Sequence, residues 1–267
     1  MRFHKKEPSM QELKNLASFR RYLWKEPNLL VVTGESASLV EGARAYNTRH
    51  GIEFPPQHQS ATLTRLLGAT GLAAVSLAER ESWGWSVALP GLDTGFFVGV
   101  EPEGMICCAL RETSPNRQNA VIQRHKPQEN QTESHIVPPD GDPVHLVEHY
   151  FQNALQTPTR IALDDTSRAV LVQSMPDGRF DEVATLKEPK LTDLVTGLAS
   201  SGALTPMGEV LLFYECRCHD ETVLKMIANL PKQTQQDLWG DKDELEIECP
   251  RCARTFLIQK KPHGKKA

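Results

Sequence analysis

The chain has 267 residues, a formal net charge of −4 and a hydrophobic content of 39%. This length and composition are typical of a globular protein with room for one large and one small domain. A charge so close to neutral gives the whole chain no general attraction to nucleic acid or to an anionic membrane surface. No apolar run approaches the roughly 20 residues needed to cross a bilayer, so we expect no membrane-spanning helix.

The N-terminus is basic, but no apolar stretch follows Met1–Lys6, and so the sequence predicts no secretory signal. We therefore expect a cytoplasmic location. In that reducing compartment, closely spaced cysteines more often bind metal or carry out redox chemistry than form permanent disulfides. The six cysteines of the chain are accordingly candidates for thiol chemistry.

The first part of the chain predicts an α+β fold in which helices pack on an antiparallel sheet. Helical spacing of apolar residues predicts one helix over residues 11–24 and a central one over residues 60–79. Short β-rich runs separated by turn residues are typical of an antiparallel meander. These predicted strands cover residues 29–33, 83–89, 95–100 and 104–111.

Composition then divides the chain into three parts. The polar stretch 113–141 is expected to be a long, weakly ordered excursion. A helix over residues 143–155 and strands at 160–163 and 169–173 complete the first domain. We expect an N-terminal α+β core domain at residues 1–175, a helical linker at 176–212 and a small C-terminal domain at 213–260.

Two cysteine pairs in the C-terminal part carry the clearest chemical signal. Cys216 and Cys218 form a CxC pair, Cys249 and Cys252 form a CxxC pair, and 30 residues separate the pairs. Such spacings let both sulfurs of a pair reach one ion, and Zn²⁺ favours four thiolates in structural sites. We predict that these cysteines bind one Zn²⁺ per chain. Because so small a domain has little core, the metal would supply much of its folding free energy.

Other residues near the four cysteines could also take part in metal binding. His219 is a competing candidate ligand. The arginines that flank the cysteines either offset the charge of a zinc bound by four thiolates or are plain surface residues; they are Arg217, Arg251 and Arg254. Cys107 and Cys108 are adjacent on a predicted strand, so their side chains point to opposite faces, and we interpret them as buried, inert thiols.

No catalytic motif accompanies the cysteines: the sequence has no hydrolase-type nucleophile context, HExxH, Walker or GxGxxG motif, and we predict no enzyme. One alternative is a zinc-ribbon module that docks nucleic acid, a ribosome or a protein partner through Arg251, Arg254 and the basic tail Lys260–Lys266. The acidic stretch 237–248 argues against nucleic acid. A thiol-disulfide oxidoreductase is less favoured, because its CxxC usually opens a helix beside a thioredoxin-like core.

In these cysteines the chain resembles the heat shock protein 33 family of redox-regulated chaperones, whose members end in CxC, about thirty residues and CxxC. The similarity extends to residues 149–160, which look like the family's Tyr-Phe helix end and its Gln-x-Pro-Thr turn. The sequence Arg65-Leu66-Leu67-Gly68 is similar to part of the family's central helix. The resemblance covers most of residues 50–258.

The resemblance implies an ATP-independent holdase, a chaperone that binds unfolded or misfolded client proteins under oxidative stress. It implies that the reduced protein binds zinc and is inactive. Oxidation would join Cys216 to Cys218 and Cys249 to Cys252, release zinc and unfold the small domain and linker. Zinc-bound thiolates are nucleophilic toward peroxide, which makes this chemistry reasonable. The family also implies a homodimer on activation; neither a membrane nor nucleic acid is expected as a partner.

Overall fold

The computed structural model describes residues 16–76, 81–88, 94–112, 120–126, 131–137 and 141–260. The strands within these residues are β1 (Leu16–Trp24), β2 (Leu29–Glu35), β3 (Ser82–Ala88), β4 (Thr94–Val100), β5 (Met105–Glu112), β6 (Ala120–Lys126), β7 (Gln131–Val137), β8 (Thr159–Leu163), β9 (Arg168–Ser174), β10 (Thr205–Tyr214), β11 (Glu244–Glu248) and β12 (Thr255–Gln259). The helices are α2 (Ala37–His50), α3 (Gln57–Ser76), α4 (Pro143–His149), α5 (Asp181–Ala184), α6 (Glu188–Ser200), α7 (Asp220–Ala228) and α8 (Lys232–Trp239). A π-helical turn, η1 (Tyr150–Ala154), continues α4.

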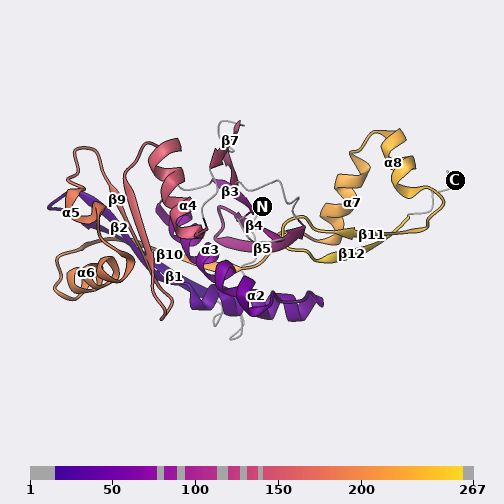
Figure 1. The fold of residues 1–267 in the computed structure, drawn as a ribbon. Helices are drawn as coiled ribbons and strands as arrows, with labels where there is room; N and C mark the ends of the chain where they lie inside the picture. The colour runs from indigo at the N-terminus through magenta and orange to yellow at the C-terminus, as the bar shows by residue number, and fades with distance from the viewer. Residues whose placement is uncertain are drawn as a thin grey trace, which may run out of the picture.

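One large sheet organises the main body of the protein (Figure 1). Its strand order is β7-β6-β3-β4-β5-β10-β1-β2-β9-β8. The described neighbours pair in antiparallel fashion except β10 and β5, which pair in parallel where Phe213 lies opposite Met105 and Tyr214 opposite Ile106. This short junction joins the meander β3-β4-β5, with β6 and β7 outside it, to the half that contains β1, β2, β8 and β9. The predicted α+β class, with helices packed on a mainly antiparallel sheet, is confirmed.

Helix α3 packs on β2, β4 and β9 and fills the centre of the core. Its buried side chains follow helical spacing, as Leu63, Leu66 and Leu67 show. Gly68 lets the helix approach the sheet closely, because a Cβ on this residue would lie 2.3 Å from Cδ2 of Leu163 on β8. The helix predicted over residues 60–79 is therefore confirmed up to residue 76, and residues 77–79 lie outside the described residues. Its glycine has a packing role.

An aromatic cluster fills the core beneath β3. The rings of Trp83 and Trp85 stack with their centroids 5.7 Å apart, and Tyr150 meets both edge-on at 5.5 and 5.4 Å. Both tryptophans are buried. Two residues apart on a strand, they share a face, and that face is the core.

The helix predicted over residues 11–24 is wrong where the structure describes it. Residues 16–24 form β1, which pairs with β2 on one side and β10 on the other, and residues 11–15 lie outside the described residues. Ala17 and Phe19 are buried at the two-residue spacing of a strand. Strand pairing with distant segments thus overrides the helical spacing of the apolar residues.

The expectation of weak order over residues 113–141 is wrong for β6 and β7. These strands form a hairpin whose first strand pairs with β3, and Ile122 lies opposite Trp85. Ala120 and Ile122 are buried on the inner face, whereas Gln123, Gln131 and Ser134 are exposed. Residues 113–119, 127–130 and 138–140 of the stretch lie outside the described residues.

Residues 176–212 contain α5, α6 and most of β10. The two helices pack on β8 and β9, and Val183, Leu191 and Val195 share an apolar cluster with buried side chains such as Leu29 and Val172. Strand β10 then crosses the sheet between β1 and β5. This segment therefore contributes helices and a strand to the main body, although residues 205–209 of β10 are exposed.

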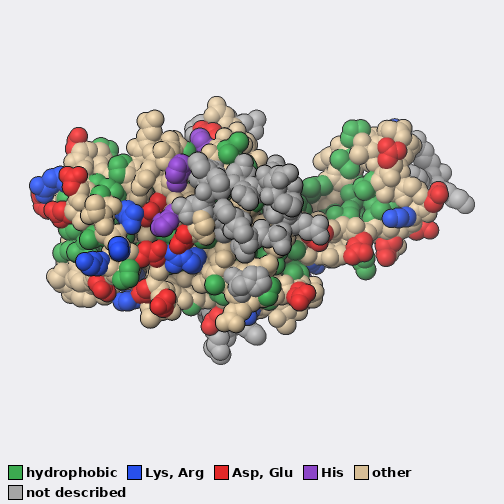
Figure 2. Space-filling model, in the orientation of Figure 1, with side chains coloured by type: hydrophobic (Ala, Val, Ile, Leu, Met, Phe, Trp, Pro, Cys, Tyr) green, Lys and Arg blue, Asp and Glu red, His purple; other side chains and the backbone are tan. Residues whose placement is uncertain are grey.

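The last elements form a small C-terminal module, α7, α8 and the hairpin β11-β12, which projects from one end of the main body (Figures 1 and 2). Its apolar core contains Val223, Ile227, Leu245, Phe256 and Ile258. Within the described residues, no helix is long and apolar enough to cross a membrane.

Candidate metal centre

The structure brings together the four cysteines that the sequence singles out. The Sγ atoms of Cys216, Cys218, Cys249 and Cys252, the four-cysteine cluster, all lie within 4.8 Å of one another. Those of Cys218 and Cys252 are 3.4 Å apart. A Zn²⁺ ion 2.3 Å from each sulfur would hold the sulfurs about 3.8 Å apart, so the cluster could hold one tetrahedral metal ion. Cys218 is half-buried, and the other three are buried.

The CxC pair is positioned by the end of β10. After Tyr214, the amide of Glu215 still donates to the carbonyl of Ile106 on β5 at 3.0 Å, so Cys216 leaves the sheet from a fixed point. Three residues beyond Cys216 the chain turns at His219 into α7. Asp220 and Glu221 occupy the first turn of this helix, where carboxylates interact favourably with the helix dipole.

The CxxC pair forms the tight turn between β11 and β12. The amide of Cys249 donates to the carbonyl of Arg254 at 2.8 Å, and the amide of Ala253 donates back to the carbonyl of Cys249 at 2.9 Å. Ala253 adopts a left-handed conformation with φ of 61°. The turn is thereby closed, with Cys249 and Cys252 both directed into the cluster.

Close packing couples the ionisation of the four thiols. The pKa of Cys216 is raised, first by its hydrogen bond with Cys107 and then by that with Cys218. The pKa of Cys249 is lowered by hydrogen bonds, first with Cys216. Four thiolates at these separations repel one another, and a divalent cation between them is the partner that their charge requires.

Helix α2 contributes a hydrogen-bond donor to the cluster. The hydroxyl of Tyr46 donates to Sγ of Cys252 at 3.2 Å and lies 3.8 Å from Sγ of Cys218. Burial and the hydrogen bond to Cys252 raise the pKa of Tyr46, so the phenol keeps its proton. Its ring also meets that of Tyr214 edge-on at 5.5 Å. A donor of this kind orients a sulfur ligand and stabilises its charge.

A buried carboxylate of the main body receives two arginines of the module. Glu101, just after β4, is 4% exposed and pairs with Arg251 and, at 3.2 Å, with Arg217. Gly99 makes room for this contact, because a Cβ there would lie 2.7 Å from Nη2 of Arg251. Arg254 instead lies over the ring of Phe256 at 4.6 Å. Two of the three flanking arginines therefore attach the module to the sheet.

The ring of Phe97 is a second attachment point. The guanidinium groups of Arg111 on β5 and Arg251 of the module lie 4.9 and 5.8 Å from its centroid. Arg111 also donates to the carbonyl of Pro250 inside the CxxC turn. Phe97, Gly99 and Glu101 alternate along one strand and so share a face of the sheet, on which the turn rests.

Cys107 and Cys108 of β5 are buried, as predicted, but they are not equivalent. The amide of Cys108 donates to the hydroxyl of Tyr214 at 2.9 Å, and this hydroxyl donates to the carbonyl of Cys108 at 3.1 Å. Burial raises the pKa of Cys108 to about 12. Cys107 instead lies opposite Gly99 on β4, the residue beside which Arg251 of the module lies. Cys107 is therefore on the face of the sheet that the CxxC turn contacts.

His219, the competing candidate ligand, lies outside the cluster. Its Nδ1 is 2.8 Å from the carbonyl oxygen of Arg217, and both ring nitrogens are within 3.2 Å of the hydroxyl of Thr222. Another group, Asp142, His145 and Glu188, is close enough to bind a cation. Arg65 already forms 2.7 Å ion pairs with Asp142 and Glu188, so a cationic side chain occupies this position.

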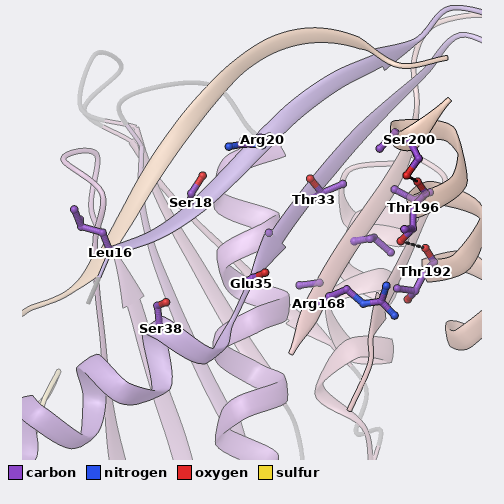
Figure 3. Close-up of a pocket in the computed structure, with 15 residues that line it drawn as sticks. Leu16, Ser18, Arg20, Thr33, Glu35, Ser38, Arg168, Thr192, Thr196 and Ser200 are labelled. Atoms are coloured by element: carbon purple, nitrogen blue, oxygen red, sulfur yellow. Dashed lines mark hydrogen bonds between the residues drawn. The ribbon is translucent and has the colours of Figure 1, made fainter. Parts of the chain in front are cut away.

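The surface has one depression beside the four-cysteine cluster and another at α6, away from it. One of about 290 Å³, between α2, β5 and the CxxC turn, has Cys252 and His50 in its lining. Another of about 440 Å³ lies between the sheet and α6 (Figure 3). There the hydroxyls of Thr192, Thr196 and Ser200 donate to carbonyls one turn earlier in α6, so they are already bonded within the helix.

Three residues at the cluster were not found from the sequence as parts of the site: Tyr46, Glu101 and Cys107. Each comes from a segment more than 100 residues before Cys216, and no spacing connects it to the cysteine motif. Of these three residues, only Cys107 could have been suspected from the sequence, because a cysteine is itself a possible metal ligand. Tertiary packing alone brings the other two to the site.

The chain is similar in sequence and fold to known proteins. The structure is similar to the crystal structure of the 33 kDa chaperonin (heat shock protein 33 homolog) of Thermotoga maritima, with a TM-score of 0.63, 15% identity and coverage of 92% of this chain and 95% of the other. A curated 33 kDa chaperonin of Hahella chejuensis is 25% identical over 151 residues, 49% of this chain and 53% of that protein. The match thus spans about half the length of that relative. The family model described as "Hsp33 protein" matches residues 37–259, and the chain belongs to this family.

Proposed function

We propose that this protein is an ATP-independent holdase chaperone, active in the cytoplasm, that is switched on when four zinc-bound thiols are oxidised. The observation that carries the proposal is the four-cysteine cluster, whose sulfurs lie within 4.8 Å of one another in a module attached to the main sheet. The family match and the names of the two relatives support chaperone activity.

The proposed switch is thiol chemistry. In the reduced protein Cys216, Cys218, Cys249 and Cys252 bind one Zn²⁺, which holds the CxC segment and the CxxC turn together. Hydrogen peroxide oxidises each pair by two electrons, so that two thiols and one peroxide give one disulfide and two waters. The disulfides join Cys216 to Cys218 and Cys249 to Cys252. A disulfide sulfur has no negative charge to offer zinc, and oxidation therefore removes the ligands.

Loss of the cluster would weaken the module because its core is small. Its buried apolar side chains, such as Val223, Ile227 and Phe256, would become accessible when α7 and the hairpin separate. Several large side chains of the module are already exposed in the folded state; they are Met226, Leu230, Leu238 and Leu257. Together these residues supply the apolar surface that an unfolded client protein requires. A homodimer of the oxidised form would enlarge this surface.

A client aggregation assay tests the proposal. The zinc-loaded, reduced protein is compared with protein treated with hydrogen peroxide under mild heating, and light scattering follows a thermally unfolding client without ATP. We expect little suppression by the reduced form and strong suppression by the oxidised form at near-equal molar ratio. Reducing agent before treatment should prevent the gain. Equal suppression by both forms would contradict a switch, and no suppression by either would contradict the chaperone activity.

We do not propose nucleic acid as a partner. Asp241, Glu244 and Glu246 are exposed on the module, and they oppose the charge of its arginines. Binding to a phosphate backbone would depend strongly on salt. An electrophoretic mobility assay with RNA at low ionic strength should therefore show no shift.

A further inference from the structure

The main body holds Arg251 of the module in a site made by β4 and the residue that follows it. The guanidinium lies against Gly99, where a Cβ would be 2.7 Å from Nη2 and 3.3 Å from Cζ of Arg251. The ring of Phe97 lies beside it, with its centroid 5.8 Å from the guanidinium carbon. Glu101 supplies the carboxylate that pairs with Arg251. We call Phe97, Gly99 and Glu101 the arginine site.

The arginine site matches the chemistry of a guanidinium group. A carboxylate accepts hydrogen bonds from the planar fork of an arginine, an aromatic ring attracts its positive charge, and a glycine leaves room for it. The side chain of Glu101 is 3% exposed and that of Arg251 is 25% exposed. Solvent and salt screen an ion pair of this kind less than a pair on the open surface. The site therefore fits a cation with the shape of arginine.

Release of the module would take away both arginines that pair with Glu101. Arg251 and Arg217 belong to the module, where they lie inside the CxxC and CxC pairs. The hydroxyl of Ser82 belongs to the main body and still donates to this carboxylate at 3.0 Å, but it carries no charge. Removing one partner of a buried ion pair is unfavourable. The opened site therefore favours a new cation in place of Arg251.

We propose that the arginine site binds an arginine side chain of an unfolded client protein after oxidation, and that Arg251 blocks the site in the reduced form as an internal competitor. The inference rests on the proposed function, because oxidation is what would move the module away. No covalent bond forms or breaks in this step. One guanidinium replaces another at Glu101, against Gly99 and beside Phe97.

A pair of peptides tests the inference with the full-length protein. One is an unstructured, fluorescently labelled peptide that contains several arginines among apolar residues. The other has citrulline, the neutral analogue of arginine, at the same positions. Fluorescence anisotropy measures binding to the zinc-loaded, reduced protein and to the protein after hydrogen peroxide. We expect the oxidised protein to bind the arginine peptide about tenfold more tightly than the citrulline peptide, and the reduced protein to bind both weakly.

Two variants that each remove one negative charge serve as matched tests. In the oxidised protein, Glu101→Gln should weaken binding of the arginine peptide about tenfold and leave the citrulline peptide unchanged. Glu209→Gln removes an exposed carboxylate of β10 and should change neither. If Glu101 only attached the module, a looser module would expose more surface, and Glu101→Gln would bind the arginine peptide at least as tightly as the wild type. That result would overturn the inference, as would equal binding of the two peptides by the oxidised wild type.

The same samples separate this inference from the proposed function when client aggregation is measured beside peptide binding. Client protection by oxidised protein that binds the two peptides equally would leave the switch standing and reject the arginine site. Binding that requires both the arginines of the peptide and Glu101, in oxidised protein that protects no client, would support the arginine site and reject the holdase.

Discussion

The hydroxyl of Tyr46 donates a 3.2 Å hydrogen bond to Sγ of Cys252, which connects helix α2 of the main body to the CxxC turn of the C-terminal module. The phenol also lies 3.8 Å from Sγ of Cys218, so one side chain contacts a cysteine from each pair. Together with Glu101, which pairs with Arg251, this tyrosine makes the four-cysteine cluster part of the contact between the module and the main body.

Removal of this donor should weaken metal binding. We expect Tyr46→Phe to lower zinc affinity roughly tenfold to a hundredfold, the usual effect of removing a partner of a metal ligand. Competition with a chromogenic chelator measures the change. Tyr214→Phe is the matched control, because this buried phenol bonds to Cys108 and not to the cluster. Equal zinc affinity in Tyr46→Phe and wild type would show that the hydrogen bond does not support the ligands.

Loss of the carboxylate of Glu101 should loosen the attachment of the module. Glu101→Gln removes the charge that Arg251 and Arg217 share, and a hydrogen bond to a charged group contributes on the order of 1–3 kcal/mol. Hydrogen exchange in the turn 249–254 should become faster in the reduced, zinc-loaded protein. Glu209→Gln removes an exposed partner of Arg20 and should leave exchange in the turn unchanged. A turn that exchanges at the wild-type rate in Glu101→Gln would count against this contact.

Two glycine substitutions in helices should have opposite effects on the main body. Gly68→Ala would place a Cβ 2.3 Å from Cδ2 of Leu163, and overpacking of this kind costs about 1–3 kcal/mol. Gly197→Ala in α6 meets no atom within 4 Å and should stabilise the protein by up to about 1 kcal/mol through helix propensity. Urea denaturation measures both. A Gly68→Ala protein as stable as wild type would mean that α3 can move away from β8.

Zinc removal under reducing conditions should unfold the module selectively. Its core is small, whereas β2 and β9 are held by a large apolar cluster, so a chelator should abolish exchange protection of residues 220–259 and leave these two strands protected. Hydrogen exchange followed by mass spectrometry measures both regions at once, and zinc added back is the control. Persistent protection of the β11-β12 hairpin in metal-free, reduced protein would show that the module folds without metal.

The sequence predicts those parts of the fold that local patterns determine. The apolar spacing of α3 and the turns between β3, β4 and β5 indicate these elements correctly. Strand β1 could not be predicted in this way, because its pairing partner β10 lies almost 200 residues later in the chain. The hairpin β6-β7 was missed for a different reason, since its polar residues dominate the composition while its few buried residues pack on β3.

At the four-cysteine cluster, too, local sequence patterns predict some residues and long-range packing determines the others. The spacing of Cys216, Cys218, Cys249 and Cys252 identifies the four thiols, because ligands on short, tight turns are close in sequence. The residues that attach the module to the sheet follow from tertiary packing. Glu101 becomes significant only when the structure places Arg251 beside Gly99, and Cys107 only when β10 ends next to β5.

Metal content measured together with thiol state tests the central claim most directly. Zinc in the purified, reduced protein is determined by atomic spectrometry for the wild type, for Cys252→Ser and for Cys108→Ser, and again after hydrogen peroxide. We predict one zinc per chain in the wild type and in Cys108→Ser, a large loss in Cys252→Ser, and release from the wild type in step with the loss of four thiols per chain. Wild-type protein without zinc, or zinc that remains bound after those thiols are oxidised, would contradict the account.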